Sequence, residues 1–180
     1  MADFTTTTWF PVLTLLLGYS AKSLSDWVDF KRTVRREREA RAESRRDKIS
    51  ERRNDFQRAT LLELQEVAHR LGRMAYQANH YDEAAFRRDP VNWQKQLLPE
   101  ETSEGFREAQ ARASLLSARV LDDEARAYLE EFRTCCTGVV FSMERDASRR
   151  ALGQLDPLHQ RFNLHVGELL RNIDSAERHE

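Results

Sequence analysis

One fragment of this sequence has the spacing of a known metal-binding motif, Glu66-Val-Ala-His69. A glutamate and a histidine three residues apart lie on one face of a helix. Helical bundles that bind two iron ions use two such pairs on facing helices, together with two more glutamates. No second Glu-x-x-His occurs in the chain. Because half of a ligand set does not hold a metal, we expect no metal and no cofactor.

Other polar residues give weaker signals of chemistry. His159 and His165 are six residues apart, which is not a same-face helical spacing, so they are poor candidates for shared ligands. The acidic cluster Asp122-Asp123-Glu124 could hold a cation or pair with arginines, but a solvated face is the simpler interpretation. No glycine-rich phosphate loop, Gly-x-Ser-x-Gly elbow or His-Glu-x-x-His is present. We therefore expect a protein that binds without catalysis.

The two cysteines, Cys135 and Cys136, are adjacent in the sequence. A disulfide between neighbours would strain the backbone, so no disulfide framework is expected. Free thiols suit a reducing compartment, which favours the cytoplasm for the part of the chain that contains them. We interpret both as packing residues.

The N-terminal segment from Phe4 to Ala21 contains 18 residues without a charge. A helix of that length spans ~27 Å, slightly short of a ~30 Å hydrocarbon core. Aromatic residues flank its apolar part, as in the interfacial belts of membrane proteins. The side chains that we expect to contact a membrane are Trp9, Phe10, Leu13, Leu15, Leu16, Leu17, Tyr19 and Trp27.

Basic residues follow the apolar run, and none precedes it. Under the positive-inside rule, this asymmetry predicts a single-pass protein of the cell membrane with its N-terminus outside and its body in the cytoplasm. A cleaved signal peptide is disfavoured, because the first three residues carry no positive charge. The side chains expected to face lipid headgroups are Lys22, Lys31, Arg32, Arg35 and Arg36.

Two other arrangements suit the same segment. Apolar residues recur at roughly helical spacing beyond Ala21, in a stripe formed by Leu13, Leu16, Leu17, Leu24, Trp27 and Val28. Such a stripe also suits a helix that lies flat in the membrane interface, which would make the protein peripheral on the cytoplasmic side. It equally suits packing against another helix, either of a partner or of a second copy.

A charge-dense segment follows, over residues 31–55, with eleven basic and six acidic side chains. It has almost no apolar stripe, so we expect a solvated helix supported by the same-face ion pairs Arg35–Glu39, Glu37–Arg41 and Glu43–Arg46. Binding of nucleic acid is not expected, because acidic residues interrupt the basic ones and no aromatic residue is available for base stacking. Attraction to anionic headgroups is the better use of the basic residues nearest the uncharged segment.

Helical periodicity returns after the charged segment. A core-facing stripe runs from Ile49 toward residue 80, and the prolines and glycine that follow predict a connection. We expect a second long helix over residues 103–134 and a further helix around residues 137–152. The last helix is expected to start with Asp156 as its cap and Pro157 in its first turn. No alternating pattern predicts a strand.

Three blocks resemble a recurrent class of small bacterial proteins: ERRNDFQRATLLELQEVAHRL, ARASLLSARVLDDEARAYLEEF and HVGELLRNI. That class is similar in layout, with a short apolar N-terminus, an Arg/Glu-rich helix and a helical body. The resemblance covers about three quarters of the chain. It implies an all-helical fold and assigns no functional residues.

We therefore predict an all-α chain with a membrane anchor or amphipathic helix (1–30), a charged helical rod (31–55), an antiparallel bundle of three to four helices (56–175) and a frayed tail (176–180). The expected function is that of a non-enzymatic, membrane-anchored interaction or scaffold protein that contacts lipid and binds a protein partner or itself. One alternative is a membrane-perturbing effector of the toxin or phage-defence type, acting through its N-terminal helix. A second is a soluble helical-bundle metal protein.

Overall fold

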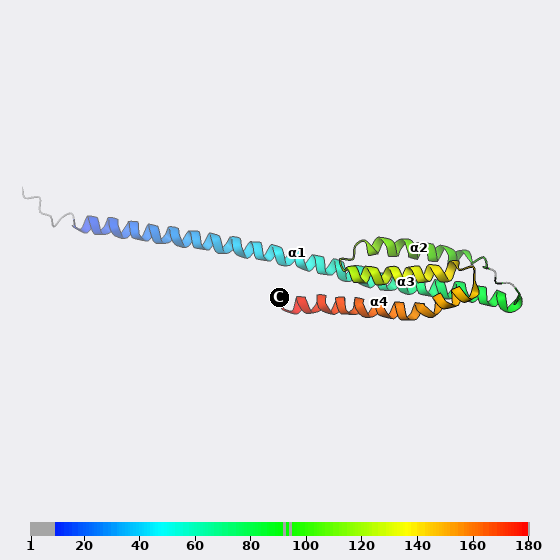
Figure 1. The fold of residues 1–180 in the computed structure, drawn as a ribbon. Coiled ribbons are helices and arrows are strands. Elements are labelled where there is room, and N and C mark those ends of the chain that lie inside the picture. Colours follow the sequence, from blue (N-terminus) through cyan, green and yellow to red (C-terminus); the bar gives the residue numbers. More distant parts are fainter. Residues whose placement is uncertain (1–9, 92, 94, 180) are drawn as a thin grey trace, which may run out of the picture. The chain divides into compact units, whose positions relative to one another are not determined.

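The computed structural model describes residues 10–91, 93 and 95–179, and the side chains of residues 27, 30–91, 93 and 95–176. Every regular element in this part of the chain is an α-helix, which confirms the prediction of an all-α fold there. The helices are α1 (Phe10–Arg88), α2 (Glu100–Ser117), α3 (Asp123–Phe141) and α4 (Arg145–His179) (Figure 1).

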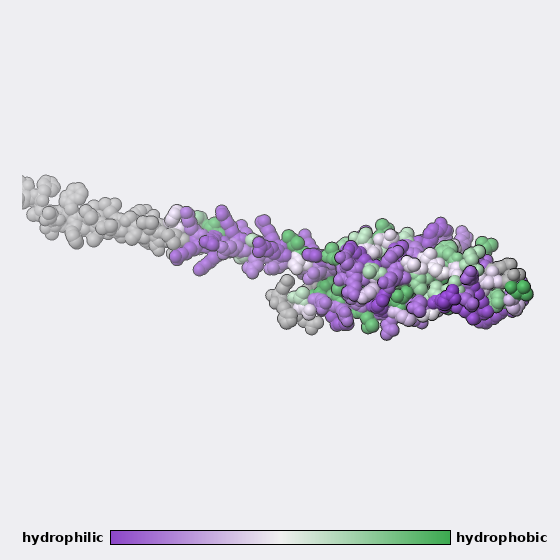
Figure 2. Space-filling view, viewed as in Figure 1, coloured by the Kyte–Doolittle hydropathy of each residue, from purple (hydrophilic) through white to green (hydrophobic). Residues whose placement is uncertain are grey.

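The chain divides into two compact units, Met1–Ser50 and Glu51–Glu180. The first part of α1 belongs to unit 1, and the rest of α1 joins α2, α3 and α4 in unit 2. Hydrophilic side chains cover most of the described surface of unit 1, with a few hydrophobic ones among them (Figure 2). Among the described side chains, the buried hydrophobic residues that form a core all belong to unit 2.

Consecutive helices of unit 2 run in opposite directions. Three hydrogen-bonded pairs join α1 to α4: Arg58–Asp174, Gln65–Asn163 and Asn79–Ser148. As the residue number rises along α1, the residue number of the α4 partner falls, so these two helices are antiparallel. The remaining neighbours pair in the same sense, through Arg112–Glu63, Gln110–Thr137 and Cys135–Ala151. Unit 2 is therefore an antiparallel bundle, as the sequence predicts.

The core of this bundle is built on one stripe of α1. Its buried residues alternate steps of three and four, which keeps them on one side of a helix: Leu61, Leu64, Ala68, Leu71, Ala75 and Ala78. Large side chains from the other helices fill the space opposite, among them Leu116, Phe132 and Phe162. Burial of each large apolar side chain contributes about 1.5–3 kcal/mol to folding.

A buried carboxylate holds the connection between α1 and α2. Asp82 is only 1% exposed, and its two oxygens accept hydrogen bonds from Lys95 Nζ at 2.5 Å and from the backbone N–H of Gln96 at 2.9 Å. Lys95 Nζ also donates to the carbonyl of Val139 at 3.0 Å. Because a buried charge is costly without partners, this network fixes the connection against α1 and α3.

The predicted helix over residues 103–134 is wrong, because the chain breaks into α2 and α3 at residues 118–122. The side chain of Gln57 stabilises the break by donating to the carbonyl of Arg119 at 2.9 Å and accepting from the N–H of Leu121 at 3.2 Å. Asp122 then caps α3 by accepting a hydrogen bond from the N–H of Ala125 at 2.7 Å. Val120 is buried in the turn.

The predicted start of the last helix at Asp156 is also wrong. A single helix, α4, begins at Arg145 and contains Pro157 in its interior. Proline removes one backbone hydrogen bond and leaves the carbonyl four residues earlier, that of Gly153, without its helical partner. Both residues are solvent-exposed, so water can satisfy that carbonyl. At its other end α4 continues to His179, past the start of the expected frayed tail.

The aromatic core should dominate the stability of unit 2. Phe132 is 1% exposed, and we expect Phe132→Ala to lower the free energy of unfolding by about 3–5 kcal/mol, since it leaves a cavity between α1, α3 and α4. Phe141→Ala, on the same helix but at a residue that is 66% exposed, should cost less than about 1 kcal/mol. Urea denaturation of both variants measures the difference, and equal losses would contradict the core described here.

A second prediction concerns acid stability. Glu83 accepts hydrogen bonds from Arg145 (2.8 Å) and Arg149 (2.8 Å), and these bonds outweigh burial and lower the pKa of Glu83 from 4.5 to about 2. The stabilisation is complete above about pH 4.5 and is lost as the pH falls toward 2. Glu83→Gln should cost about 2 kcal/mol at neutral pH and flatten the decline in stability over that acid range.

Glu108→Gln is the matched control for Glu83, because it removes an exposed ion pair with Arg70 and should change stability by less than about 1 kcal/mol. Denaturation midpoints at neutral pH and near pH 3 distinguish the variants. An unchanged acid slope in Glu83→Gln would show that other groups cause the acid sensitivity.

Candidate functional site

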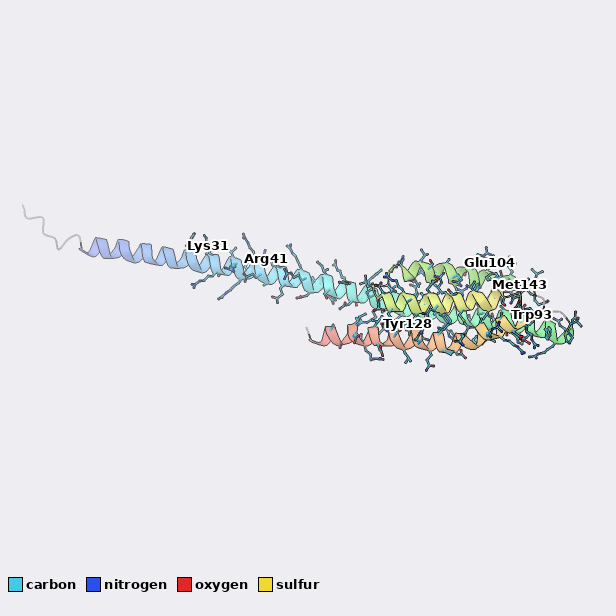
Figure 3. The ribbon with its side chains drawn as sticks, in the orientation of Figure 1. Lys31, Arg41, Trp93, Glu104, Tyr128 and Met143 are labelled. Atoms are coloured by element: carbon cyan, nitrogen blue, oxygen red, sulfur yellow. The ribbon has the colours of Figure 1, made fainter. Side chains whose placement is uncertain are left out.

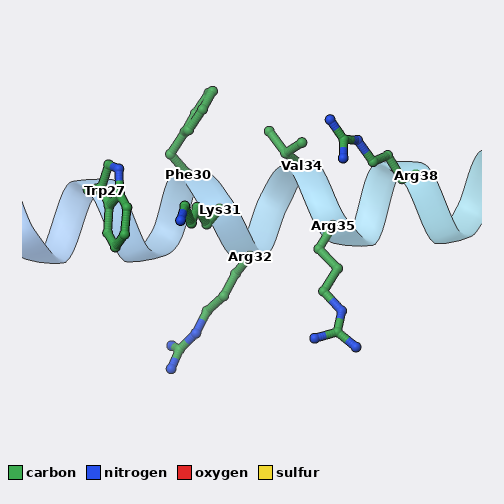
Figure 4. Close-up of a pocket in the computed structure, with 7 residues that line it drawn as sticks. All are labelled: Trp27, Phe30, Lys31, Arg32, Val34, Arg35 and Arg38. Atoms are coloured by element: carbon green, nitrogen blue, oxygen red, sulfur yellow. The ribbon is translucent and has the colours of Figure 1, made fainter.

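The described part of unit 1 presents a face that combines aromatic and basic side chains. We call Trp27, Phe30, Lys31, Val34, Arg35 and Arg38 the basic–aromatic face; they line a shallow hollow along α1. In Figure 4, Phe30 and Val34 point to one side, Arg32 and Arg35 to the other, and Trp27 and Lys31 lie between them. Trp27 is 55% and Phe30 67% exposed, although large aromatic side chains gain free energy when they leave water.

The charges of this face are held only by weak, exposed interactions. Lys31 Nζ lies 3.9 Å from the centre of the Trp27 ring, in a cation–π contact. Arg35 Nε lies 2.8 Å from Glu39 Oε1, and that hydrogen bond raises the pKa of Arg35. Farther along, Arg41 pairs with Glu37 at 3.0 Å. Two of the three predicted ion pairs are therefore confirmed, and no ion pair joins Glu43 to Arg46 among the described side chains. Exposed pairs of this kind leave the arginines accessible to other anions.

The predicted membrane-contacting residues fall mostly outside the described side chains. Trp9 lies outside the described residues altogether. Six others lie in the helical backbone of α1, but their side chains are outside those described: Phe10, Leu13, Leu15, Leu16, Leu17 and Tyr19. Trp27 is described and exposed. Within the described residues, no helix combines the length and apolar character needed to cross a membrane.

The structure describes the side chains of four of the five residues that were predicted to face lipid headgroups. Lys22 belongs to α1, with its side chain outside the described set. Lys31, Arg32, Arg35 and Arg36 are all exposed, and Figure 3 shows Lys31 and, farther along, Arg41 extending away from the helix (Figure 3). The structure thus groups part of this set with Trp27 on one face. Phe30, Val34 and Arg38 belong to the same face and were not among the residues that we predicted.

An open groove of about 320 Å³ lies between α1, α3 and α4 in unit 2. His69 and His159 face each other in it, with ring centroids 6.1 Å apart, and His159 stacks on Phe132 at 5.2 Å. Gly72 makes room for the Phe132 ring, since a Cβ at residue 72 would lie 3.3 Å from Phe132 Cζ. Burial and the neighbouring His69 lower the pKa of His159, although Asp156 opposes them. His159 is therefore largely neutral at neutral pH.

The metal-binding motif is not completed in this groove. Asp156 precedes His159 by three residues and so repeats the Glu66–His69 spacing on the facing helix, a signal that a search for glutamate alone missed. Because α1 and α4 are antiparallel, the two carboxylates are displaced in opposite directions from the histidine pair. Asp156 instead hydrogen-bonds Tyr76. Among the described residues, no three His, Cys, Asp or Glu side chains come together as a metal site requires.

The acidic cluster has a structural role. Asp122 is the cap of α3, and Asp123 and Glu124 occupy its first turn, where carboxylates interact favourably with the helix dipole. His165 Nε2 lies 2.8 Å from Asp122 Oδ1. Burial alone would raise the pKa of Asp122, but the hydrogen bonds from Ala125 N–H and His165 lower it. His159 and His165 thus contact different residues: His159 lies against His69 and Phe132, and His165 pairs with Asp122.

The two cysteines pack inside unit 2, as predicted. Cys135 Sγ donates a hydrogen bond to the carbonyl of Ala151 at 3.0 Å, and Cys136 is fully buried. Burial raises the pKa of Cys135, and burial and the neighbouring Cys135 raise that of Cys136 to about 12. Neither thiol is therefore activated as a nucleophile at neutral pH.

No protein-family model, curated protein or solved structure matches this chain. We therefore infer its function from the surfaces and charges of the described side chains. The basic–aromatic face of unit 1 and the histidine groove of unit 2 are the two regions with unusual chemistry, and only the first combines exposed apolar surface with several cations.

The histidine groove predicts a pH-dependent stability. The pKa of folded His159 lies below its ordinary value of 6.5, so the unfolded chain takes up this proton first as the pH falls. The free energy of unfolding should therefore decline below about pH 6.5. It should decline less in His159→Phe, which keeps an aromatic ring against Phe132. His80→Gln, at an exposed position of α1, is the control and should retain the parental decline. Urea midpoints at about pH 7.5 and 5.5 measure the effect; equal slopes in all three proteins would refute it.

Proposed function

We propose that this protein is a membrane-associated helical interaction protein that acts by binding and without chemistry. The observation that carries this proposal is the exposure of Trp27 and Phe30 beside several basic side chains, directly after the uncharged segment of residues 4–21. Exposed aromatic rings and cations together suit the boundary between lipid and water. The uncharged segment would hold the chain to the membrane, either by spanning it or by lying in its interface.

The bundle would face the cytoplasm. The abundance of basic residues after the uncharged segment supports an orientation with the N-terminus outside if the segment spans the bilayer. If the segment lies in the interface, the protein would be peripheral on the same side. The unpaired thiols Cys135 and Cys136 also suit a reducing compartment.

Unit 2 offers a surface for a protein partner or a second copy. Large apolar side chains are exposed on or beside the α1–α2 and α3–α4 connections, which lie at the same end of this unit: Val91, Leu97, Phe141 and Met143. Met143 and Trp93 are seen at that end in Figure 3. An exposed apolar cluster favours association with another protein surface. We propose that unit 2 binds through this end while the N-terminal segment holds the chain at the membrane.

Fractionation of cells that express the full-length chain tests this function. We expect the protein in the membrane pellet after a high-salt wash. Leu13→Glu/Leu16→Glu should move most of it to the soluble fraction, because each charge costs about 2.5–3.5 kcal/mol inside a bilayer. Leu164→Glu, a charge at an exposed position of α4, is the control and should remain in the pellet.

Alkaline extraction separates the two modes of attachment, since a spanning helix resists it and an interfacial helix is released. Recovery of the parental chain in the soluble fraction before any extraction would overturn the proposal. Growth arrest with membrane depolarisation on expression would instead favour a membrane-perturbing effector.

A further inference from the structure

We infer that the basic–aromatic face binds the surface of a bilayer containing anionic lipid, with residues 27–38 lying along that surface. The inference rests on the proposed membrane association and adds to it the class of lipid and the orientation of this segment. It requires residues 10–21 to lie in the interface and not to span the bilayer, because α1 continues without a break from Phe10 through residues 27–38.

The angular arrangement of the face suits an interface between water and lipid. At about 100° per residue, its six residues cover less than half of the helix circumference. The aromatic and aliphatic side chains, Phe30 and Val34, extend to one side together with Arg38, and Arg35 extends to the other, with Trp27 and Lys31 between. A helix lying in the headgroup region can then bury the apolar edge while its cations reach lipid phosphates.

The charge of the segment specifies an anionic partner. Residues 30–38 contain five basic side chains and one acidic side chain, Glu37, which is paired with Arg41. The cation–π contact places the Lys31 ammonium against Trp27, so an aromatic ring and a cation would enter the headgroup layer together. Each basic residue close to an anionic surface contributes about fivefold to membrane affinity.

The length of the segment determines its orientation. At ~1.5 Å per residue, Arg38 lies ~25 Å beyond Ala21 along a helix, whereas each headgroup layer is only ~5–8 Å thick. An upright helix would leave Arg38 in water, beyond the range of the surface charge. A helix along the surface brings Trp27, Lys31, Arg35 and Arg38 to the headgroups at once. In the sequence, Leu13, Leu16, Leu17 and Leu24 recur at spacings that continue the same face.

Charge repulsion disfavours a second copy as the occupant of this face. Two such faces packed together would bring at least six cations into one interface, and like charges at close range are destabilising. Nucleic acid would satisfy the cations. It offers no apolar layer for Phe30 and Val34, and those residues are what make the surface unusual.

The test uses the full-length chain with Trp9→Phe and Trp93→Phe, which leaves Trp27 as the only tryptophan. Trp93→Phe sacrifices no hydrogen bond, since the buried Trp93 Nε1 has no partner among the described residues. The protein is mixed with vesicles of phosphatidylcholine alone or of phosphatidylcholine with phosphatidylglycerol. We expect binding to the mixed vesicles to be at least about a hundredfold tighter than to phosphatidylcholine alone. We also expect a blue shift of Trp27 emission and its quenching by lipids brominated near the headgroup.

Two matched variants isolate the face. Lys31→Gln/Arg35→Gln/Arg38→Gln should lose the preference for phosphatidylglycerol by roughly a hundredfold. Arg45→Gln/Arg46→Gln/Lys48→Gln removes the same charge from exposed positions farther along unit 1 and should lose less than about fivefold. Circular dichroism confirms that both variants keep their helices.

The outcomes separate this inference from the proposed function. Binding to neither vesicle would overturn both. Equal binding to the two vesicles, or Trp27 emission unchanged on binding, would leave membrane association standing and overturn the inference. Equal losses of phosphatidylglycerol preference in the two triple variants would show that binding depends on the total charge of unit 1 and not on the basic–aromatic face. Tighter binding to duplex DNA than to the mixed vesicles at the same salt, or a dimer that the face variant abolishes, would also overturn it in favour of those partners.

Discussion

Burial of the α1 stripe from Leu61 to Ala78 is the interaction on which the rest of unit 2 depends. The stripe gives α2, α3 and α4 a common apolar surface, and the rings of Phe132 and Phe162 fill the space beside it. Because all four helices contribute to one core, the polar contacts between them have a fixed register. The buried Asp82 and the double pairing of Glu83 can hold the connections only because that core has already brought the helices together.

The two units differ in the partners and in the exposure of their charged side chains. In unit 2, Asp82 attaches the α1–α2 connection to α1 and Glu83 joins α1 to α4, and both carboxylates are largely withdrawn from water. In unit 1, the pairs Arg35–Glu39 and Glu37–Arg41 are local and exposed, and contribute a few tenths of a kilocalorie per mole each. Charges held so weakly remain available to an external partner. This difference is the physical reason for assigning membrane contact to unit 1 and protein contact to unit 2.

The residues that first suggested chemistry prove to have structural explanations. The acidic cluster Asp122–Glu124 starts a helix, and the two adjacent thiols are packed with raised pKa values. His69 belongs to a histidine pair whose carboxylate neighbours do not converge. Each residue type has the intrinsic reactivity that the sequence suggests. Burial and helix direction then decide which of these side chains can react.

By itself, the sequence determined the helical class, most of the core-facing stripe of α1 and two of the three expected ion pairs of the charged segment, because each depends on residues within a few turns of one helix. The expected start of that stripe at Ile49 is wrong, because Ile49 is 67% exposed. Only the tertiary structure decided where the later helices begin and end. The break at residues 118–122 contains no glycine or proline and depends on Gln57, some sixty residues away. Pro157 stays inside α4 because the carbonyl that it leaves without a partner, that of Gly153, is on the solvent-exposed side, while Leu155 and Phe162 are buried on the other side. In both places, contacts between distant residues outweigh the local preference of the chain.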